Sequence, residues 1–428
     1  MALTICLYED KKYRNFFPLT YMRPVFALRA GMVPLFARTH RFFPDVTVSL
    51  ACRQQLASIL AATHKDYPVN IIKKGEMDVL LLNGRIRDFG DLPKLIAEAR
   101  ISTLFTSGGE TVGILLKNEG IRKLGGVATP AEYQQHLQAE GGNIPEFHTS
   151  ATLYGYLWEI MGGIEKEVAA DFRWLQDTWP PSTGVKVHDG AGWVNQSDIF
   201  LGNGVEVMPG AVVDASAGPV YLGDNTRVES FAAVYGPTYV GPNSVVVAGK
   251  LTSSSIGHTC RIGGEVEHCV FQSYVNKYHA GFIGHSYVGE WVNFGAMTTN
   301  SDLKNNYSNI RVTVNGESID TGSIKVGSFI GDHTKFGIGM LLNTGINIGV
   351  CCNIFGGSLV SDKEVPCFRW GSTGDYVDYD VNKAIEAASA VARRRDYSLS
   401  AAEVDLLAAI ASGRIEDEGV SDFHIPGT

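Results

Sequence analysis

A repeat of six residues governs the second half of the chain. Aliphatic or aromatic side chains recur at this interval, and Gly follows several of them directly. Such a period fits neither the ~3.6 residues of a helical turn nor the simple alternation of a strand. It predicts a solenoid of three flat faces joined by tight corners, with about 18 residues per coil. The repeat comprises Leu201, Val207, Val213, Leu222, Val228, Val234, Val240, Val246, Ile330, Phe336, Leu342, Ile348, Ile354 and Val360.

Each coil is expected to direct one aliphatic residue per face inward and to use Gly or Asn at its corners, where the backbone is tight. Stacked coils then bury a continuous core that no single coil buries alone. A β-sandwich with evenly spaced turns is the alternative, but sandwiches do not hold a fixed phase over repeat after repeat. We therefore expect a parallel β-helix over residues 186–368.

Composition argues against several classes of function. A net charge of −9 and a pI near 5.7 give no general attraction to nucleic acid or to anionic lipid. The sequence shows neither a signal peptide nor an apolar run long enough for a membrane span. Seven cysteines without metal-site spacing are typical of a reduced, cytoplasmic protein. Within the repeat, one of Cys351 and Cys352 should point inward and the other outward.

Residues 1–150 alternate between strand-like and helix-like patterns, which indicates an α/β domain with a mostly parallel sheet. Ligands of such sheets bind beyond the carboxyl ends of the strands, which directs attention to residues 9–29 and 83–85. The expected strands are Leu3–Leu7, Val46–Leu50, Val69–Ile72, Val79–Leu82 and Thr111–Leu116, and the expected helices are Gly31–Ala37, Arg53–Ala62 and Leu92–Ala99.

Helices are expected on both sides of the solenoid. Residues 151–185 contain an amphipathic pattern that predicts a linker helix docking between the two domains. Residues 369–428 predict a cap of two helices, one from Tyr376 to Arg395 and one that begins at Ser400 with a capping box and stops at Gly413. Such a cap covers the unpaired strand edge at a solenoid end.

The six-residue phase is lost between Ile262 and Ile324. Loops leave a solenoid at such interruptions, and functional residues concentrate on them. Lys and Asn donors in this region are suited to a phosphorylated sugar, and a His is suited to take a proton from an attacking amine because its pKa lies near neutrality. The candidate polar residues are Glu265, Glu267, His268, Asn276, Lys277, His279, His285, Asn293, Asn300 and Lys304.

Five segments in this region form an ordered series: Gly263–Glu267, His279, Phe282–Gly284, Val288–Gly289 and Val292–Ala296. The series resembles the acetyltransferase half of the bifunctional UDP-N-acetylglucosamine pyrophosphorylase/glucosamine-1-phosphate acetyltransferases, and more closely their archaeal sugar-1-phosphate relatives. The resemblance implies a left-handed β-helix in a homotrimer, with acetyl-CoA between neighbouring chains. It implies His279 as the general base and Asn293 as its companion. We add Glu267, Lys277 and Asn300 as substrate-binding candidates and Lys304 as a contact for a CoA phosphate.

The N-terminal half resembles the nucleotidyltransferase domain of the same family, in its divergent GlmU-like branch. Pro18–Thr20, Arg23–Pro24, Leu28–Gly31 and Asn83–Arg85 carry this similarity. The family's glycine-rich nucleotide loop is absent, and residues 9–14 stand in its place. Arg85 falls about where the family has a metal-binding Asp. The candidates for nucleotide and phosphate binding are Arg14, Arg23, Arg29, Asn83 and Arg85, and those for Mg²⁺ are Glu9, Asp10 and Asp88.

These observations predict a two-domain enzyme of sugar-nucleotide biosynthesis. The first domain would join a sugar 1-phosphate to UTP or dTTP, and the β-helix would transfer an acetyl group from acetyl-CoA to an amino sugar phosphate. One alternative is a nucleotidyltransferase whose β-helix only forms the trimer. Another is a scaffold or sensor that binds a sugar nucleotide without turnover.

Overall fold

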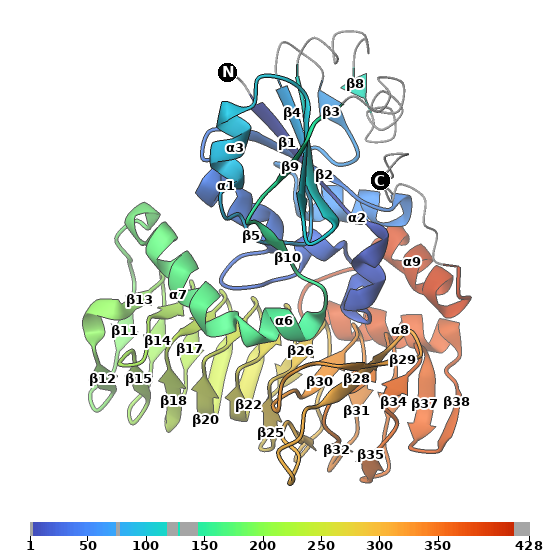
Figure 1. Ribbon diagram of the computed structural model, residues 1–428. Coiled ribbons are helices and arrows are strands. Elements are labelled where there is room, and N and C mark those ends of the chain that lie inside the picture. The colour runs from blue at the N-terminus through green and yellow to red at the C-terminus, as the bar shows by residue number, and fades with distance from the viewer. Residues whose placement is uncertain (1–2, 74–77, 118–126, 129–143, 415–428) are drawn as a thin grey trace.

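An N-terminal α/β domain rests on one side of a long β-solenoid (Figure 1). The computed structural model describes residues 3–73, 78–117, 127–128 and 144–414. The domain is built on a six-stranded sheet with the order β2-β1-β4-β7-β6-β9. Its strands are β1 (Leu3–Tyr8), β2 (Thr47–Ala51), β4 (Asp78–Asn83), β6 (Thr103–Ser107), β7 (Glu110–Leu116) and β9 (Glu146–His148).

Five of the six strands run in one direction and β7 runs against them, which confirms the prediction of a mostly parallel sheet. β1 runs parallel to β2 and β4, but β7 runs antiparallel to both β4 and β6. β6 and β7 form a hairpin through Gly108 and Gly109, which both have positive φ. A Gly-Gly pair between two strand-like runs favours such a tight hairpin. The predicted strand at Val69–Ile72 is only the short β3 (Ile72–Lys73), which pairs with β8 (Val127–Ala128).

Helices α2 (Gln54–Thr63) and α3 (Leu92–Glu98) confirm two of the predicted helices. The helix predicted over Gly31–Ala37 is wrong, because Pro34 lacks an N–H group and disfavours a helical conformation in the residue before it. Short helical turns cover this part of the chain instead. They are η1 (Lys11–Phe16), η2 (Leu19–Tyr21), η3 (Val25–Ala27), η4 (Leu35–Arg38) and α1 (Thr39–Phe42).

The solenoid is a left-handed parallel β-helix with three faces, and its first strand, β11, begins at Lys186. The first face contains β11 (Lys186–Val187), β14 (Glu206–Val207), β17 (Arg227–Val228), β24 (Asn276–Lys277), β31 (Lys335–Phe336), β34 (Asn353–Ile354) and β37 (Arg369–Ser372). The second contains β12 (Gly192–Val194), β15 (Val212–Asp214), β18 (Ala232–Tyr235), β25 (Phe282–Gly284), β27 (Thr299–Asn300), β32 (Leu341–Leu342) and β35 (Leu359–Val360). Strands β20 (Val245–Thr252) and β22 (Arg261–Glu267) bend across both faces.

The third face is the side that carries the N-terminal domain. Its strands are β13 (Ile199–Leu201), β16 (Val220–Leu222), β19 (Thr238–Val240), β21 (Ser255–Ile256), β23 (Val270–Phe271), β26 (Tyr287–Val288), β30 (Ser328–Ile330), β33 (Ile346–Ile348) and β36 (Glu364–Val365). The residues of the six-residue repeat from Val207 to Val360 are buried in the solenoid core, which confirms the inward positions. Cys352 also lies in this core, whereas Cys351 faces outward toward the C-terminal helices, as the alternation predicted.

The prediction of Gly or Asn at the corners is correct in part. Gly190, Gly210, Gly249, Gly264, Gly281 and Gly339 have positive φ at the corner between the first and second faces. The corner between the third and first faces has positive φ at Asn225 and Asn243 in early coils. Later coils place larger side chains in the same left-handed conformation: Thr259, Tyr274, Trp291, His333, Cys351 and Phe368. Between the second and third faces, the corresponding residues are Ser253, His268 and His285. The left-handed conformation is uncommon for such residues.

The repeat is interrupted where the sequence predicted a loop. Tyr287 pairs with Phe329 across 42 residues, whereas neighbouring coils are much shorter. The inserted segment forms a hairpin of β28 (Arg311–Val314) and β29 (Glu317–Asp320). Ile310, Val312 and Val314 are buried in a cluster with Tyr13, Phe16 and Phe17 of the N-terminal domain. The insertion therefore folds back onto its own chain.

Two linker helices, α6 (Leu157–Gly162) and α7 (Ile164–Leu175), lie along the third face beneath the N-terminal sheet (Figure 1). The sequence predicted one helix here, and the break falls at Gly162–Gly163. Strand β10 (Thr152–Leu153) precedes them and pairs with β5 (Ile86–Asp88). Outward-pointing side chains of the third face pack below, among them Phe200, Tyr221, Tyr239, Val270, Tyr287 and Phe329.

The C-terminal helices are α8 (Val381–Arg393) and α9 (Ala401–Ala411). The predicted start at Tyr376 is wrong, because residues 375–378 form β38 (Asp375–Asp378), which pairs with β37. The capping box of Ser400 and Glu403 is confirmed. Leu406, Leu407 and Ile410 of α9 pack in one cluster with α2, so the cap bridges the two domains. None of the described helices is long and apolar enough to cross a membrane.

Two substitutions in the inserted segment test whether it packs against the N-terminal domain. We expect Ile310→Ala to lower the free energy of unfolding by about 2–5 kcal/mol, because it opens a cavity at a fully buried site. Ile324→Ala removes an exposed side chain from the same insertion and should change stability by less than about 0.5 kcal/mol. Denaturant unfolding of both variants measures the difference. Equal values would mean that the insertion does not pack on the N-terminal domain in solution.

Candidate functional site

His279 lies at the corner between the first and second faces, on the side of the solenoid away from the N-terminal domain. It is exposed, and its ring meets that of Tyr278 edge to face at 5.4 Å. Beneath it, the buried Lys277 donates hydrogen bonds from Nζ to the carbonyl oxygens of Gly263 (2.8 Å) and His279 (2.5 Å). Burial lowers the pKa of the Lys277 ammonium to about 8. Lys277 therefore supports the backbone that presents His279.

The other candidates of this region are dispersed. Asn293 lies on the first face, where its Oδ1 accepts a hydrogen bond from Asn276 Nδ2 at 2.8 Å. Asn300 is buried, and its side-chain amide bonds both the N–H and the carbonyl of Gly284, so it joins two coils. The Lys304 ammonium donates to the Asn309 carbonyl within the insertion. Glu267 lies at the corner between the second and third faces, a different corner from that of His279.

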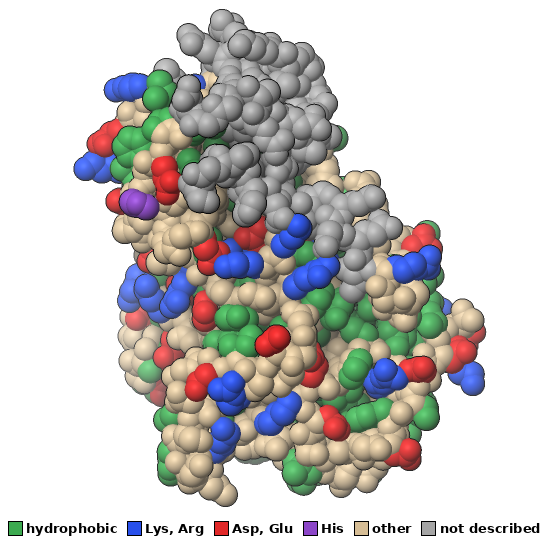
Figure 2. All heavy atoms as spheres, turned by 45° about the vertical axis from the view of Figure 1, so that its right-hand side comes forward, with side chains coloured by type: hydrophobic (Ala, Val, Ile, Leu, Met, Phe, Trp, Pro, Cys, Tyr) green, Lys and Arg blue, Asp and Glu red, His purple; other side chains and the backbone are tan. Residues whose placement is uncertain are grey.

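Exposed apolar side chains follow the corner of His279 along the solenoid. They occupy the same turn in several coils. On the face shown in Figure 2, hydrophobic side chains lie in patches among the charged ones. In two coils the corner contains Gly249 or Gly264. A Cβ at either position would collide with the backbone of the next coil. The exposed residues are Phe231, Tyr278, Met297, Ile338 and Phe355. We call them the corner line.

At the carboxyl end of β1, two of the predicted metal ligands, Glu9 and Asp10, are engaged in ion pairs. Glu9 is fully buried and bonds Arg53 (Nε–Oε2 2.8 Å), which is also buried, and it accepts the backbone N–H of Val25. Desolvation raises the pKa of the Glu9 carboxyl despite the nearby guanidinium. Asp88 is exposed and bonds the N–H of Gly90 in its own turn.

Asp10 and Glu110 are bridged by the guanidinium of Arg85. Arg85 donates to Asp10 at 2.8–3.0 Å, to Glu110 and to the Tyr154 carbonyl at 2.7 Å. Asn83 donates to Asp10 at 2.9 Å. A divalent cation needs carboxylate oxygens that are free to bind it, whereas here Arg85 pairs with both groups and Lys12 also pairs with Glu110. Glu9, Asp10 and Asp88 therefore do not fit a protein-built Mg²⁺ site.

The three arginines of the loop after β1 have different surroundings. Arg14 is exposed. Arg23 reaches across to the solenoid, where it forms a bidentate pair with Asp332 and lies 3.6 Å from Glu290. Arg29 stacks over the Tyr239 ring at 5.2 Å and has a buried Nε without a hydrogen-bond partner in the described structure.

A cavity of about 320 Å³ lies between the N-terminal loop, helix α2, the solenoid corner and helix α9. One wall is a stack of rings on successive coils, with Tyr274 on Trp291 at 3.9 Å and His333 at 6.3 Å beyond. His333 has a buried Nδ1 without a partner among the described residues. Burial lowers the pKa of His258 and His333, so both are neutral at pH 7.

Sequence reasoning missed most of this cavity. Arg23 and Arg29 were candidates, but Tyr274, Trp291 and Tyr397 were not. A signal was present, because aromatic residues stand at corner positions where Gly or Asn was expected. Aromatic rings and arginines in a cavity of this size suit a ligand with a planar ring and a phosphate group.

A substitution of Glu9 tests whether this residue has a structural role or binds a metal ion. We expect Glu9→Gln to destabilise the protein by about 3–5 kcal/mol, because it leaves the buried Arg53 guanidinium unpaired. Asp88→Asn removes an exposed carboxylate and should leave the unfolding midpoint unchanged. Thermal melts with and without Mg²⁺ provide the measurement. Stabilisation of the parent protein by Mg²⁺ that Glu9→Gln abolishes would contradict this assignment.

Known proteins are similar to parts of this chain. The family described as sugar nucleotidyl transferase matches residues 5–178. A bifunctional sugar-1-phosphate nucleotidylyltransferase/acetyltransferase of Sulfurisphaera tokodaii is 30% identical over 124 residues, which are 29% of each chain. The bifunctional protein GlmU of Methanococcus vannielii is 27% identical over 135 residues, 31% of this chain and 30% of that protein. The chain thus matches less than a third of the length of these relatives.

Solved structures with similarity include LpxA from Acinetobacter baumannii, with 15% identity, a TM-score of 0.27 and coverage of 50% of this chain and 78% of that one. The polySia-specific acetyltransferase NeuO has 11% identity, a TM-score of 0.24 and coverage of 50% and 96%. The family match at residues 5–178 and the curated relatives show that the chain resembles the bifunctional GlmU-type nucleotidylyltransferase/acetyltransferases, as its motifs predicted.

Proposed function

We propose that this protein is a transferase of sugar-nucleotide biosynthesis with an activity in each domain. The match of residues 5–178 to the sugar nucleotidyl transferase family supports the first activity. The observation that carries the second is His279, exposed at a corner whose backbone the buried Lys277 supports. Both reactions use soluble metabolites, so we place the protein in the cytoplasm.

In the acyl transfer, the amine of an amino sugar 1-phosphate attacks the thioester carbonyl of acetyl-CoA. The imidazole of His279 takes the proton of the amine as the N–C bond forms, and the C–S bond then breaks to release the thiol. Asn293 is the proposed companion that positions the reacting groups, and Lys304 is the proposed contact for a CoA phosphate.

We further propose a homotrimer. The corner line of Phe231, Tyr278, Met297, Ile338 and Phe355 supports this, because monomeric proteins seldom leave a row of large apolar side chains exposed. A second copy of the chain would cover the line and would complete the acetyl-CoA site beside His279.

For the N-terminal activity, a phosphate oxygen of the sugar 1-phosphate attacks the α-phosphorus of UTP or dTTP, and pyrophosphate leaves. The cavity between the domains supports such a site, with Tyr274 and Trp291 available to stack on the base and Arg29 to meet a phosphate. Glu9, Asp10 and Asp88 do not fit a Mg²⁺ site. The Mg²⁺ ion would therefore arrive bound to the triphosphate.

A paired turnover assay tests both activities. With glucosamine 1-phosphate and acetyl-CoA, we expect His279→Ala to reduce thiol release about 10²–10⁴-fold, which is the usual contribution of a general base. His188→Ala, which changes a partly exposed His at the far end of the solenoid, should have no effect. With N-acetylglucosamine 1-phosphate, UTP or dTTP and Mg²⁺, pyrophosphate release should be equal in both variants.

Two other outcomes of the turnover assay would favour the alternative functions. Pyrophosphate release without thiol release would leave the β-helix as an assembly device. Binding of a sugar nucleotide without either product would indicate a scaffold or sensor, a role that the Arg85 bridge between Asp10 and Glu110 favours.

The trimer proposal has its own consequence. We expect Ile338→Glu to place a charge in the interface, to convert the trimer to monomers in sedimentation and to abolish thiol release. Pyrophosphate release should persist, because its proposed site lies within one chain. Leu359→Glu, at an exposed position of the second face outside the corner line, is the control. A parent protein that sediments as a monomer would exclude the proposal.

A further inference from the structure

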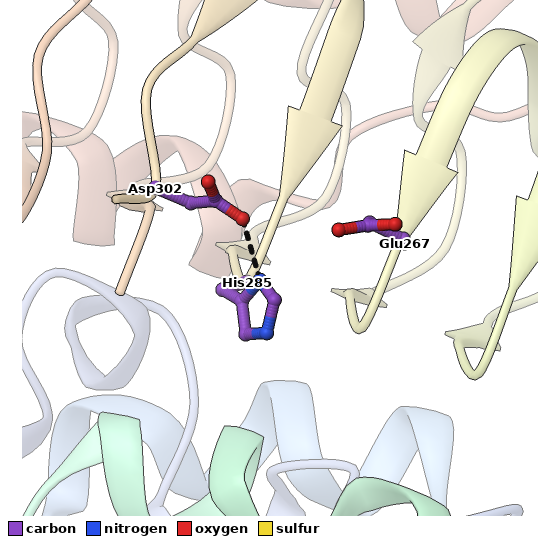
Figure 3. Close-up of side chains that lie close together, drawn as sticks. All are labelled: Glu267, His285 and Asp302. Atoms are coloured by element: carbon purple, nitrogen blue, oxygen red, sulfur yellow. Dashed lines mark hydrogen bonds and ion pairs between the residues drawn. The ribbon is translucent and has the colours of Figure 1, made fainter. Parts of the chain in front are cut away.

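Three side chains converge at the corner between the second and third faces, each from a successive coil. Glu267 ends β22, His285 follows β25, and Asp302 lies two residues beyond β27. Figure 3 shows the His285 ring projecting from the solenoid, with the carboxylates of Glu267 and Asp302 on either side of it. One potential ligand atom from each residue lies within 4.8 Å of the other two.

The corner holds these residues rigidly. The backbone N–H of His285 donates to the Glu267 carbonyl at 3.0 Å, and that of Val326 donates to the Asp302 carbonyl at 2.9 Å. The His285 ring also stacks on that of His268, with centroids 4.7 Å apart. A site whose backbone is fixed by hydrogen bonds of this kind is organised before any ligand arrives.

The charges of the cluster are incompletely balanced. The side chains of Glu267, His285 and Asp302 are only 20%, 16% and 12% exposed. His285 Nδ1 bonds Asp302 Oδ2 at 2.7 Å, but the nearest cation to Glu267 is Lys325, at 3.9 Å and 44% exposed. Two carboxylates this close repel each other, and partial burial strengthens the repulsion unless a cation lies between them.

The cluster borders a cavity of about 430 Å³ between the solenoid and the linker helices. His285 and Lys325 line it from the solenoid, and Arg87 and Glu165 line it from the N-terminal half of the chain. An ion held beside His285 would therefore have space for water or an anion on its cavity side. This cavity is separate from the corner line and from the ring-lined cavity at helix α9.

We propose that Glu267, His285 and Asp302 bind one divalent transition-metal ion of the Zn²⁺ or Mn²⁺ class. An imidazole nitrogen with two carboxylate oxygens suits these ions. Mg²⁺ binds this set less well, because it favours oxygen ligands and retains its water. Three protein ligands leave coordination positions open, as in catalytic rather than structural zinc sites.

The test uses the full-length protein after dialysis against a chelator. Calorimetric titration with Zn²⁺ and Mn²⁺ should give one ion per chain at this site, and Mg²⁺ should bind at least about 10-fold more weakly. Glu267→Gln and Asp302→Asn preserve side-chain shape, and each should weaken Zn²⁺ binding by about 10-fold or more. Lys325→Met should tighten binding, because it removes a cation that competes for Glu267.

Glu165→Gln is the matched control, because Glu165 lines the same cavity but is not one of the three ligands. It should leave affinity unchanged. In the Co²⁺-loaded protein, visible absorption should disappear in His285→Ala, which reports the loss of a ligand without reference to activity. Thermal melts verify that each variant is folded.

Absence of Zn²⁺ and Mn²⁺ binding by the folded parent protein would overturn the proposal and leave His285 and Asp302 as a simple hydrogen-bonded pair. Binding that survives in Glu267→Gln, Asp302→Asn and His285→Ala would overturn it as well, because the ion would then lie elsewhere, for example on cysteine thiolates.

Discussion

The packing of the N-terminal domain on the third face of the solenoid is the constraint on which the rest of the structure depends. Outward-pointing aromatic side chains of that face, such as Tyr287 and Phe329, are buried against the loop that follows β1. The same loop contributes Tyr13 and Phe16 to the cluster. Loops beyond the carboxyl ends of parallel strands usually surround a ligand. Here the loop packs against the solenoid, so the side chains of the loop have structural partners before any substrate binds.

This arrangement explains why so many charged candidates are paired internally. Glu9 with Arg53, and Asp10 with Arg85, lie where the covering domain restricts water, and an unpaired charge there would be costly. Arg23 forms a similar ion pair across the interface with Asp332 of the solenoid. Such pairs contribute little net stability compared with an apolar contact, but they fix which groups face one another.

Periodicity predicted the solenoid because each inward residue has one dominant interaction, burial, which the sequence reports directly. The strands β1, β2, β4 and β7 were predictable for the same reason. Pairing was not, because the identity of a partner depends on contacts between residues far apart in the chain. The antiparallel β7 was signalled only by Gly108 and Gly109. The partners of Glu9 and Arg85 had no signal at all, since ion pairs carry no periodic pattern.

The departures from the repeat were more informative about function than the repeat itself. A left-handed backbone conformation costs a non-glycine residue on the order of 1–3 kcal/mol, so it persists only where surrounding contacts compensate. Trp291 and His333 adopt it at the corner that faces the ring-lined cavity, and His268 and His285 adopt it at the corner that faces the linker helices.

The third corner, which carries His279, faces away from the N-terminal domain and has exposed apolar residues instead. Each corner of the triangular solenoid thus has a different chemistry and a different setting. One faces the N-terminal loop and helix α9, one faces the linker helices, and one is exposed. A solenoid built only to form a trimer needs large side chains at one corner alone. Strained or exposed side chains at all three corners argue that this solenoid contributes directly to binding, and not only to assembly.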